Sequence, residues 1–416
     1  MSGTDTGGLR RRLGVRDAVV IGLGSMIGAG VFTAFGPAAE AAGSGLLLGL
    51  ALAAVVAYCN ATSTARLAAR YPQSGGTYVY GRERLGDFWG YLAGWGFVVG
   101  KTASCAAMAL TVGAYAWPGQ AHAVAVAAVV ALTTLSCAGV QKAAGVTRAV
   151  VAVVLAVLAA VVTALLTSGA AETSRLGIGG DITAGGVLQA AGLLFFAFAG
   201  YARIATLGEE VRDPRRTIPR AIPLALGITL AVYTAVAVAV LAVLGPERLA
   251  QSAAPLTDAV RAAGVPALAP VVRVGAAVAA LGSLLALILG VSRTTLAMAR
   301  DHHLPRTLAA VHPRSGVPRH AEIAVGTVVA VLAATVDVRD AIGFSSFGVL
   351  VYYAIANAAA RTLGPDEGRP PLPVPLIGLA GCLVLAFTLP VDSVLVGGSV
   401  LLAGAAVYGL RGRTRN

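Results

Sequence analysis

Apolar stretches of about 20 residues recur along the whole chain, and this feature limits its fold more than any other. Each stretch is long enough to cross the hydrocarbon core of a bilayer as a helix. Hydrophobic residues make up 57% of the 416 residues and charged residues only 12%, about half the charged fraction of a soluble protein. A soluble globule is therefore excluded. The runs are also too long and too uniformly apolar for the strands of a membrane barrel, so an all-α polytopic membrane protein is indicated.

The hydropathy pattern predicts about twelve transmembrane helices. Residues 1–16 are polar and contain no cleavable apolar segment, so we expect no signal peptide and a first span that stays in the mature protein. The predicted spans lie near residues 17–41, 44–68, 89–116, 121–140, 146–168, 186–208, 219–244, 268–297, 319–336, 341–360, 371–390 and 392–410.

The net charge of +12 orients the chain in the membrane. In a soluble protein this charge would suggest nucleic-acid binding, but most of the 31 Lys and Arg residues lie at the ends of apolar segments. Basic residues are enriched in cytoplasmic loops, so we predict a cell-membrane protein with both termini in the cytoplasm and no nucleic-acid partner. The predicted cytoplasmic loops are 66–87, 141–148, 209–220, 298–319 and 361–370, and loop 209–220 contains Asp213-Pro214, interpreted as a helix stop.

Residues 22–32 contain four glycines in the middle of the first span. Glycine weakens a helix, so one interpretation is that the span breaks there and leaves backbone amides that would bind a carboxylate. Close packing of a small-residue surface on another helix explains the same glycines. The motif by itself leaves these two interpretations open.

The sixth span favours the broken-helix interpretation. It reads LLFFAFAGYAR over residues 193–203 and is interrupted by Gly200 and by the charge of Arg203. Interruptions in the first span and again five spans later predict two inverted five-helix repeats, with a binding site between their broken helices.

Four segments carry a resemblance to a known family. They read GSMIGAGVF at residues 24–32, YPQSGGTYVY at 71–80 and GEEVRDPRRTIP at 208–219, followed by SR, MARD and LP within 292–305. In this order they resemble the successive signatures of amino acid-polyamine-organocation permeases, closest to the branch of prokaryotic amino acid permeases and cationic amino acid transporters. The resemblance covers residues 17 to 320, whereas spans eleven and twelve match by length and hydropathy alone.

The resemblance implies a five-plus-five inverted-repeat fold with discontinuous spans one and six that works by alternating access. Residues 1–16 would then be a cytoplasmic tail, residues 17–361 the transport core of ten spans, and residues 362–416 spans eleven and twelve with a cytoplasmic C-terminal tail. It implies an amino acid as substrate, the lipid bilayer as surroundings and no cofactor.

The resemblance also implies a substrate site. The substrate carboxylate would be bound by the backbone of the first break, at Ser25, Met26, Ile27, Gly28, Ala29 and Gly30. Its amino group would meet free carbonyl oxygens at Phe198, Ala199, Gly200 and Tyr201. Phe196 falls where the family often has an aromatic side chain that occludes the substrate, and the alternative is an ordinary packed Phe.

Two charges lie inside apolar runs, Lys101 and Arg203. Burial in a membrane is costly for a charge and disfavours an ammonium group, so Lys101 is predicted to exchange a proton during transport. Val154 stands where some proton-coupled members have a lysine, and Ala202 replaces an acidic residue common in the family. Arg203 has two interpretations. It is either a functional charge within the membrane or an ordinary charge near the cytoplasmic surface that pairs with Glu209 or Glu210.

We therefore predict a secondary carrier of amino acids, driven by a proton gradient or by exchange. A carrier of amines or polyamines and a nutrient sensor without net flux are the alternatives. An enzyme is not expected, because the spans hold no catalytic triad, carboxylate pair or metal-ligand cluster. No nucleotide-binding motif is present and the loop histidines lack metal-ligand spacing, so neither ATP nor a metal is implied. The oligomeric state is left open.

Overall fold

The computed structural model describes residues 13–73, 75–139, 144–177, 179, 182–205, 211–312 and 316–413. Pairing of β type in these ranges is limited to an isolated bridge between Leu13 and Val211. Helices dominate the rest, as predicted. They are α1 (Val15–Met26), α2 (Gly30–Thr33), α3 (Phe35–Ala42), α4 (Leu46–Arg70), α5 (Thr77–Leu85), α6 (Asp87–Ala116), α7 (Ala121–Cys137), α8 (Ala144–Thr167), α9 (Ala184–Phe198), α10 (Ala202–Ala205), α11 (Pro214–Gln251), α12 (Pro255–Ala262), α13 (Ala269–Arg300), α14 (Arg319–Thr335), α15 (Val338–Arg361), α16 (Pro373–Phe387) and α17 (Val391–Arg413).

Ten helical segments in the described ranges are long and apolar enough to cross a membrane. Helices also form at the two remaining predicted spans, but α14 has 17 residues and α16 has 15. The polytopic membrane fold is therefore confirmed, while the count of twelve crossings stays a prediction.

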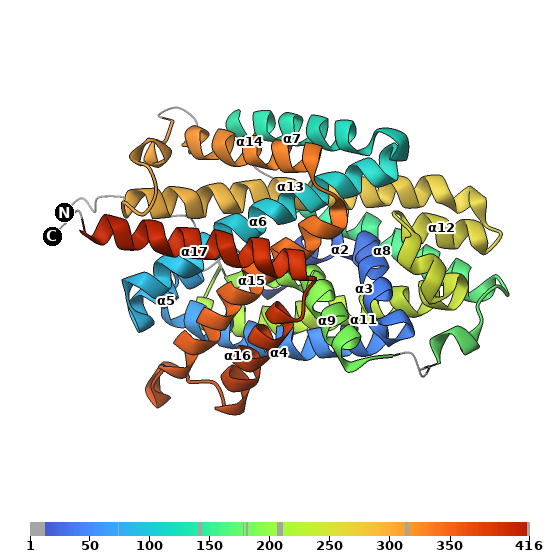
Figure 1. Ribbon diagram of the computed structural model, residues 1–416, viewed down its shortest axis with the longest axis horizontal. Helices are drawn as coiled ribbons and strands as arrows, with labels where there is room; N and C mark the ends of the chain where they lie inside the picture. Colours follow the sequence, from blue (N-terminus) through green and yellow to red (C-terminus); the bar gives the residue numbers. More distant parts are fainter. Residues whose placement is uncertain are drawn as a thin grey trace.

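The long helices run roughly along the longest axis of the molecule, with α6 and α15 in the interior (Figure 1). Helix α6 packs most extensively against α15 and α13. Small residues allow this approach, because a Cβ on Gly348 would lie only 3.0 Å from the Cα of Gly100. The most apolar windows of α6 and α15 are 78% and 83% buried, against 17% in the spans containing α7 and α17, which lie at the periphery.

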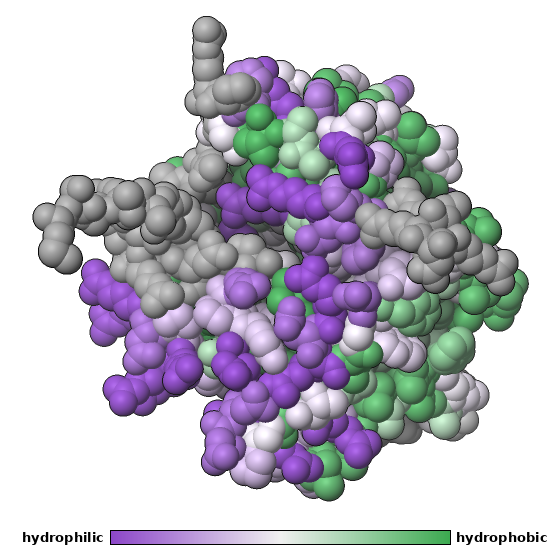
Figure 2. All heavy atoms as spheres, turned by 90° about the vertical axis from the view of Figure 1, so that its left-hand side faces the viewer, coloured by the Kyte–Doolittle hydropathy of each residue, from purple (hydrophilic) through white to green (hydrophobic). Residues whose placement is uncertain are grey.

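The two ends of the molecule differ in the segments they carry. Helix α5, the connection from α13 to α14 and the connection from α15 to α16 lie at one end, and α12 lies at the other (Figure 1). Figure 2 views the α5 end and shows hydrophilic side chains gathered over much of it, with hydrophobic side chains at its right-hand rim. Three loops predicted to be cytoplasmic therefore share one end, which we call the basic end.

Asp213-Pro214 differs from the prediction, because it starts a helix instead of stopping one. Pro214 is the first residue of α11, after Asp213 in a left-handed conformation with φ of 46°. The first position of a helix tolerates proline, since its missing amide hydrogen would have no helical acceptor there. Glu209 and Glu210, predicted as partners of Arg203, lie outside the described residues.

Candidate functional site

The first span is broken in the middle, as the glycine density predicts. Helix α1 ends at Met26, and Ile27 leaves the helical region with ψ of 63°. The Gly28 amide bonds to the Met26 carbonyl at 2.8 Å, and a helical ladder resumes when the Thr33 amide bonds to Ala29 at 3.1 Å. The first amides of the resumed helix have no helical acceptor, so the break presents hydrogen-bond donors within an apolar region.

The sixth span is also interrupted. Helix α9 ends at Phe198, a 3₁₀ turn spans Ala199–Tyr201, and helix resumes in α10. The Ala199 carbonyl oxygen accepts hydrogen bonds from Lys101 Nζ at 3.3 Å and from the Tyr353 hydroxyl at 3.4 Å. This second break presents a carbonyl acceptor to side chains of α6 and α15.

The two breaks lie in direct contact. A Cβ added to Gly200 would lie 2.3 Å from the Ser25 carbonyl oxygen and 2.7 Å from the Met26 amide nitrogen. One added to Gly30 would lie 2.5 Å from the Ala197 Cβ. These glycines are thus required where the interrupted spans cross, and both interpretations of the first-span glycines apply, because the segment is broken and closely packed.

Neighbouring helices contribute hydroxyl groups to the breaks. The Tyr233 hydroxyl of α11 lies 2.5 Å from the Met26 carbonyl oxygen and 3.0 Å from that of Ala197, so it bridges the two spans. The Ser283 hydroxyl of α13 donates to the Gly24 carbonyl at 3.1 Å. Sequence analysis missed both residues, and the only signal for either was a hydroxyl-bearing side chain within an apolar run.

The aromatic residues predicted at the sixth-span break are all buried. The Phe198 ring packs on that of Tyr233 at a centroid distance of 5.2 Å, and the Tyr201 ring on that of Tyr353 at 5.1 Å. Their rings are thus part of the core, and the substrate contacts predicted for this segment are those of its backbone. Phe196 is also buried, and its occluding role stays a prediction.

The remaining predicted residues of the first break are buried too, apart from partly exposed Ser25. The Ser25 hydroxyl bonds to the Ile21 carbonyl of its own helix at 3.0 Å, so it is occupied locally. Met26, Ile27 and Ala29 are buried in the apolar interior. What this segment offers a ligand is therefore its backbone.

Lys101 lies near the middle of α6 and is 5% exposed. A buried ammonium group loses the hydration that stabilises its charge, and hydrogen bonds in the protein replace only part of it. The contact with Ala199 links this residue directly to the break in the sixth span. Within the described ranges, no three His, Cys, Asp or Glu side chains gather to hold a metal ion.

Two of the signature segments meet away from the breaks, at the basic end. The Tyr78 hydroxyl donates to Asp301 at 2.6 Å and lies 2.9 Å from His303 Nδ1. Arg82 pairs with the same Asp301 carboxylate at 2.6 Å. These signatures therefore join α5 to the end of α13 and do not form the candidate substrate site.

A second ion-pair cluster at this end joins the α15–α16 connection to α4 and α5. Glu367 pairs with Arg84 and, at 3.0 Å, with Arg70. The hydrogen bond from Arg84, the Gly364 amide and Arg70 together lower the pKa of Glu367 to about 2. A carboxyl group with a lowered pKa stabilises the fold above its ordinary pKa of about 4.3, and the effect is lost only as pH falls through the folded value.

We therefore expect Glu367→Gln to lower the melting temperature by the same amount at pH 5 and at pH 8. Both values lie above the pH range in which Glu367 would gain a proton. Thermal unfolding of purified wild type and variant at the two pH values tests this. The matched control is Asp366→Asn, which changes the exposed neighbouring carboxylate and should leave the melting temperature unchanged. A loss confined to pH 8 would contradict the assignment.

Comparison with known proteins gives a consistent result. The family model described as "Amino acid permease" matches residues 17–360. An uncharacterized transporter of Mycobacterium tuberculosis is 77% identical over 403 residues, covering 97% of this chain and 92% of the relative. A branched-chain amino acid permease of Bacillus subtilis is 26% identical, covering 97% and 94%. A vacuolar cationic amino acid transporter of Arabidopsis thaliana is 28% identical, covering 86% and 64%.

Proposed function

We propose that this chain, which belongs to the amino acid permease family, is a secondary carrier of amino acids that works by alternating access. The observation that carries the proposal is the contact between two interrupted spans. In the first, the amides of the resumed helix lack helical acceptors, and in the second, the Ala199 carbonyl accepts hydrogen bonds from the side chains of Lys101 and Tyr353. Two inverted five-helix repeats would place such breaks together. The basic end would then face the cytoplasm, with both termini on that side of the cell membrane.

In the proposed site, the substrate carboxylate lies against the backbone of residues 25–30. Backbone amides at the start of a helix favour negative charge, because the helix dipole and the unpaired donors act together. The substrate amino group lies against the carbonyls of the Ala199–Tyr201 turn, where an ammonium group can donate. A zwitterion matches both breaks at once, whereas a polyamine lacks the carboxylate that the first break would bind.

Lys101 is the proposed coupling residue. Its ammonium group and the substrate amino group would share the acceptors of the second break, so the proton on Lys101 and the substrate would influence each other. The protonated and neutral forms would favour different arrangements of α6 against the sixth span, as a coupling ion requires.

Uptake into proteoliposomes tests the proposal. Purified protein should accumulate labelled amino acids above equilibrium when a pH gradient is imposed, or exchange them against internal amino acid. The decarboxylated amine of the same substrate should not be taken up. Uptake of the amine alone would favour an amine carrier, and binding without flux would favour a sensor.

Neutral or acidic amino acids should be preferred over arginine and lysine. Among the described residues, the side chains that hydrogen-bond to the two breaks include those of Thr33, Lys101, Thr229, Tyr233, Ser283 and Tyr353, and none of these six is acidic. A second positive charge on the substrate would meet Lys101 without a carboxylate to pair with. Competition against uptake of a neutral amino acid measures the preference. Clear inhibition by arginine or lysine at the lowest concentrations would overturn it.

A further inference from the structure

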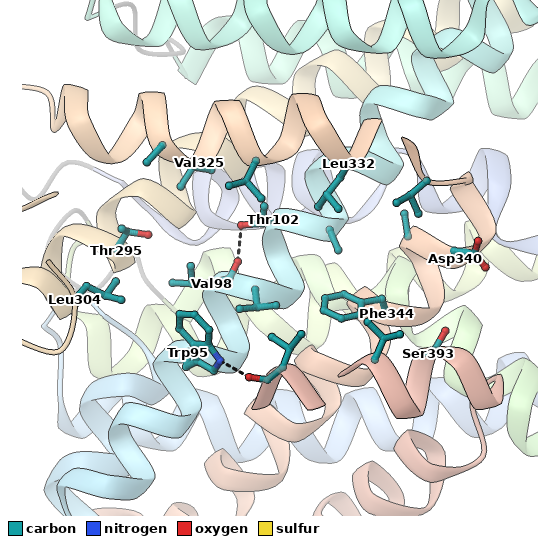
Figure 3. A pocket seen from close by; sticks show the side chains of 18 of the residues that line it. Trp95, Val98, Thr102, Thr295, Leu304, Val325, Leu332, Asp340, Phe344 and Ser393 are labelled. Atoms are coloured by element: carbon teal, nitrogen blue, oxygen red, sulfur yellow. Dashed lines mark hydrogen bonds between the residues drawn. The ribbon is translucent and has the colours of Figure 1, made fainter. Parts of the chain in front are cut away.

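A groove in the side of the molecule lies apart from the two breaks. Residues of α6, α14, α15 and α17 and of the α13–α14 region line it, and its volume is about 660 Å³, within the range of ligand pockets. No residue predicted to bind substrate is among those lining it. Figure 3 shows Thr295 and Leu304 at one end, Asp340 and Ser393 at the other, and mainly apolar side chains between them.

Two carboxylates border this groove at one end. Asp340 lies in the first turn of α15 and Asp392 in the first turn of α17. The helix dipoles explain each carboxylate separately, but not why both face one apolar groove. The described residues of the lining include no Lys, Arg or His, and the adjacent Arg339 is engaged elsewhere by Glu40 and by the Ala250 carbonyl. The Asp end is therefore complementary to a cation.

An unpaired hydroxyl lies at the opposite end. Thr295 is 4% exposed and lines the groove, and its hydroxyl has no hydrogen-bond partner in the part of the chain that the structure describes. Its neighbours Ser292 and Thr294 bond to carbonyls of their own helix at 2.7 and 3.3 Å. A buried hydroxyl without a partner is costly. The unpaired Thr295 hydroxyl therefore indicates that a ligand group hydrogen-bonds to it at this end.

We propose that the groove binds a single-chain amphiphilic primary amine that enters from the bilayer. Its ammonium group lies between Asp340 and Asp392, and its chain follows the apolar wall toward Thr295. Helix α14 and the residue that follows it line the groove from Ala324 to Val336, a length of about 18 Å at the helical rise per residue. That length suits a chain of about a dozen carbon atoms and is well short of the roughly 30 Å hydrocarbon core of a bilayer.

Trp95 lines the groove and serves as the reporter. The chain has three tryptophans, so the double change Trp89→Phe and Trp117→Phe leaves Trp95 alone in the full-length protein. Its fluorescence in nanodiscs is titrated with 12-bromododecylamine, whose bromine quenches tryptophan, and with the matching bromo-alcohol and bromo-acid. We expect saturable quenching by the amine, with at least about tenfold weaker apparent affinity for the alcohol and the acid.

Changing both Asp340 and Asp392 to Asn should weaken amine binding about tenfold or more and remove its advantage over the alcohol. The control is Asp366→Asn, because Asp366 is an exposed carboxylate in the connection at the basic end and does not line the groove. It should bind the amine as the wild type does. Unchanged Trp95 emission before titration shows that each variant keeps the groove folded.

The Thr295 end is tested by competition of unlabelled 12-aminododecanol and dodecylamine against the brominated amine. We expect the hydroxylated amine to bind about three- to tenfold tighter to the wild type and equally to Thr295→Val. Equal quenching by amine, alcohol and acid would overturn the proposal, because bilayer hydrocarbon alone would then fill the groove. Loss of quenching when two copies of the protein associate would also overturn the proposal, because a second copy of the chain would then cover the groove.

Discussion

Replacing Gly28 by Val is expected to abolish substrate binding and transport while leaving expression largely intact. A Cβ at this position would lie 2.3 Å from the Ser283 Oγ and 2.9 Å from its Cβ, closer than side-chain atoms can approach. The added atoms would push the first break away from α13 and cover the amides proposed to receive the carboxylate. Equilibrium binding of labelled amino acid to purified protein, together with uptake, measures both effects.

Gly227→Val is the matched control, because a Cβ on Gly227 would have no described atom within 4 Å beyond its chain neighbours and the backbone of α11 itself. Its effect on binding should be small. A paired change supplies a stricter test. Gly28→Ala should impair binding alone and recover in combination with Ser283→Gly, since removing the serine side chain makes room for the new methyl group. Full binding by Gly28→Val would show that this segment does not receive the substrate.

Replacing Lys101 by Ala is expected to abolish accumulation driven by a pH gradient, while exchange of internal for external amino acid continues. Lys101 is buried and bonds to the Ala199 carbonyl in the sixth-span break. A proton there can bias transport only if it alters the balance between outward-open and inward-open arrangements. Without the amine, that balance loses its proton dependence, but the proposed substrate contacts remain.

Lys101→Arg separates the charge from the proton. The guanidinium keeps a positive charge near Ala199 but does not release its proton at any pH used for transport. We expect this variant to lose pH-driven accumulation as Lys101→Ala does. The measurement is uptake in proteoliposomes with an imposed pH gradient, paired with exchange in the absence of one. If either variant still concentrates substrate in a pH-dependent manner, sodium coupling or pure exchange is the better account.

Local properties made the helices and their interruptions predictable. Lipid offers no partners for backbone groups, so long apolar segments form helices whatever their neighbours are. The breaks were equally local, because glycine density around Gly28 and the pairing of Gly200 with the charge of Arg203 disfavour a continuous span before any packing is considered. The same local reasoning was wrong at Pro214, since proline disfavours the helix before it but is well accepted as the first residue of a helix.

The contacts around the breaks depended on the tertiary structure. Tyr233 bonds to the carbonyl of Met26 although 207 residues separate them along the chain, and no local pattern marks a hydroxyl that will meet a distant helix break. The signature residues Tyr78 and Asp301 meet at the basic end for the same reason. The sequence alone thus determined the membrane class, the helical segments and the two interruptions, because these follow from hydropathy and backbone propensity. Only the packing of α6, α11, α13 and α15 decided which side chains reach the breaks, because that depends on how separate helices approach one another.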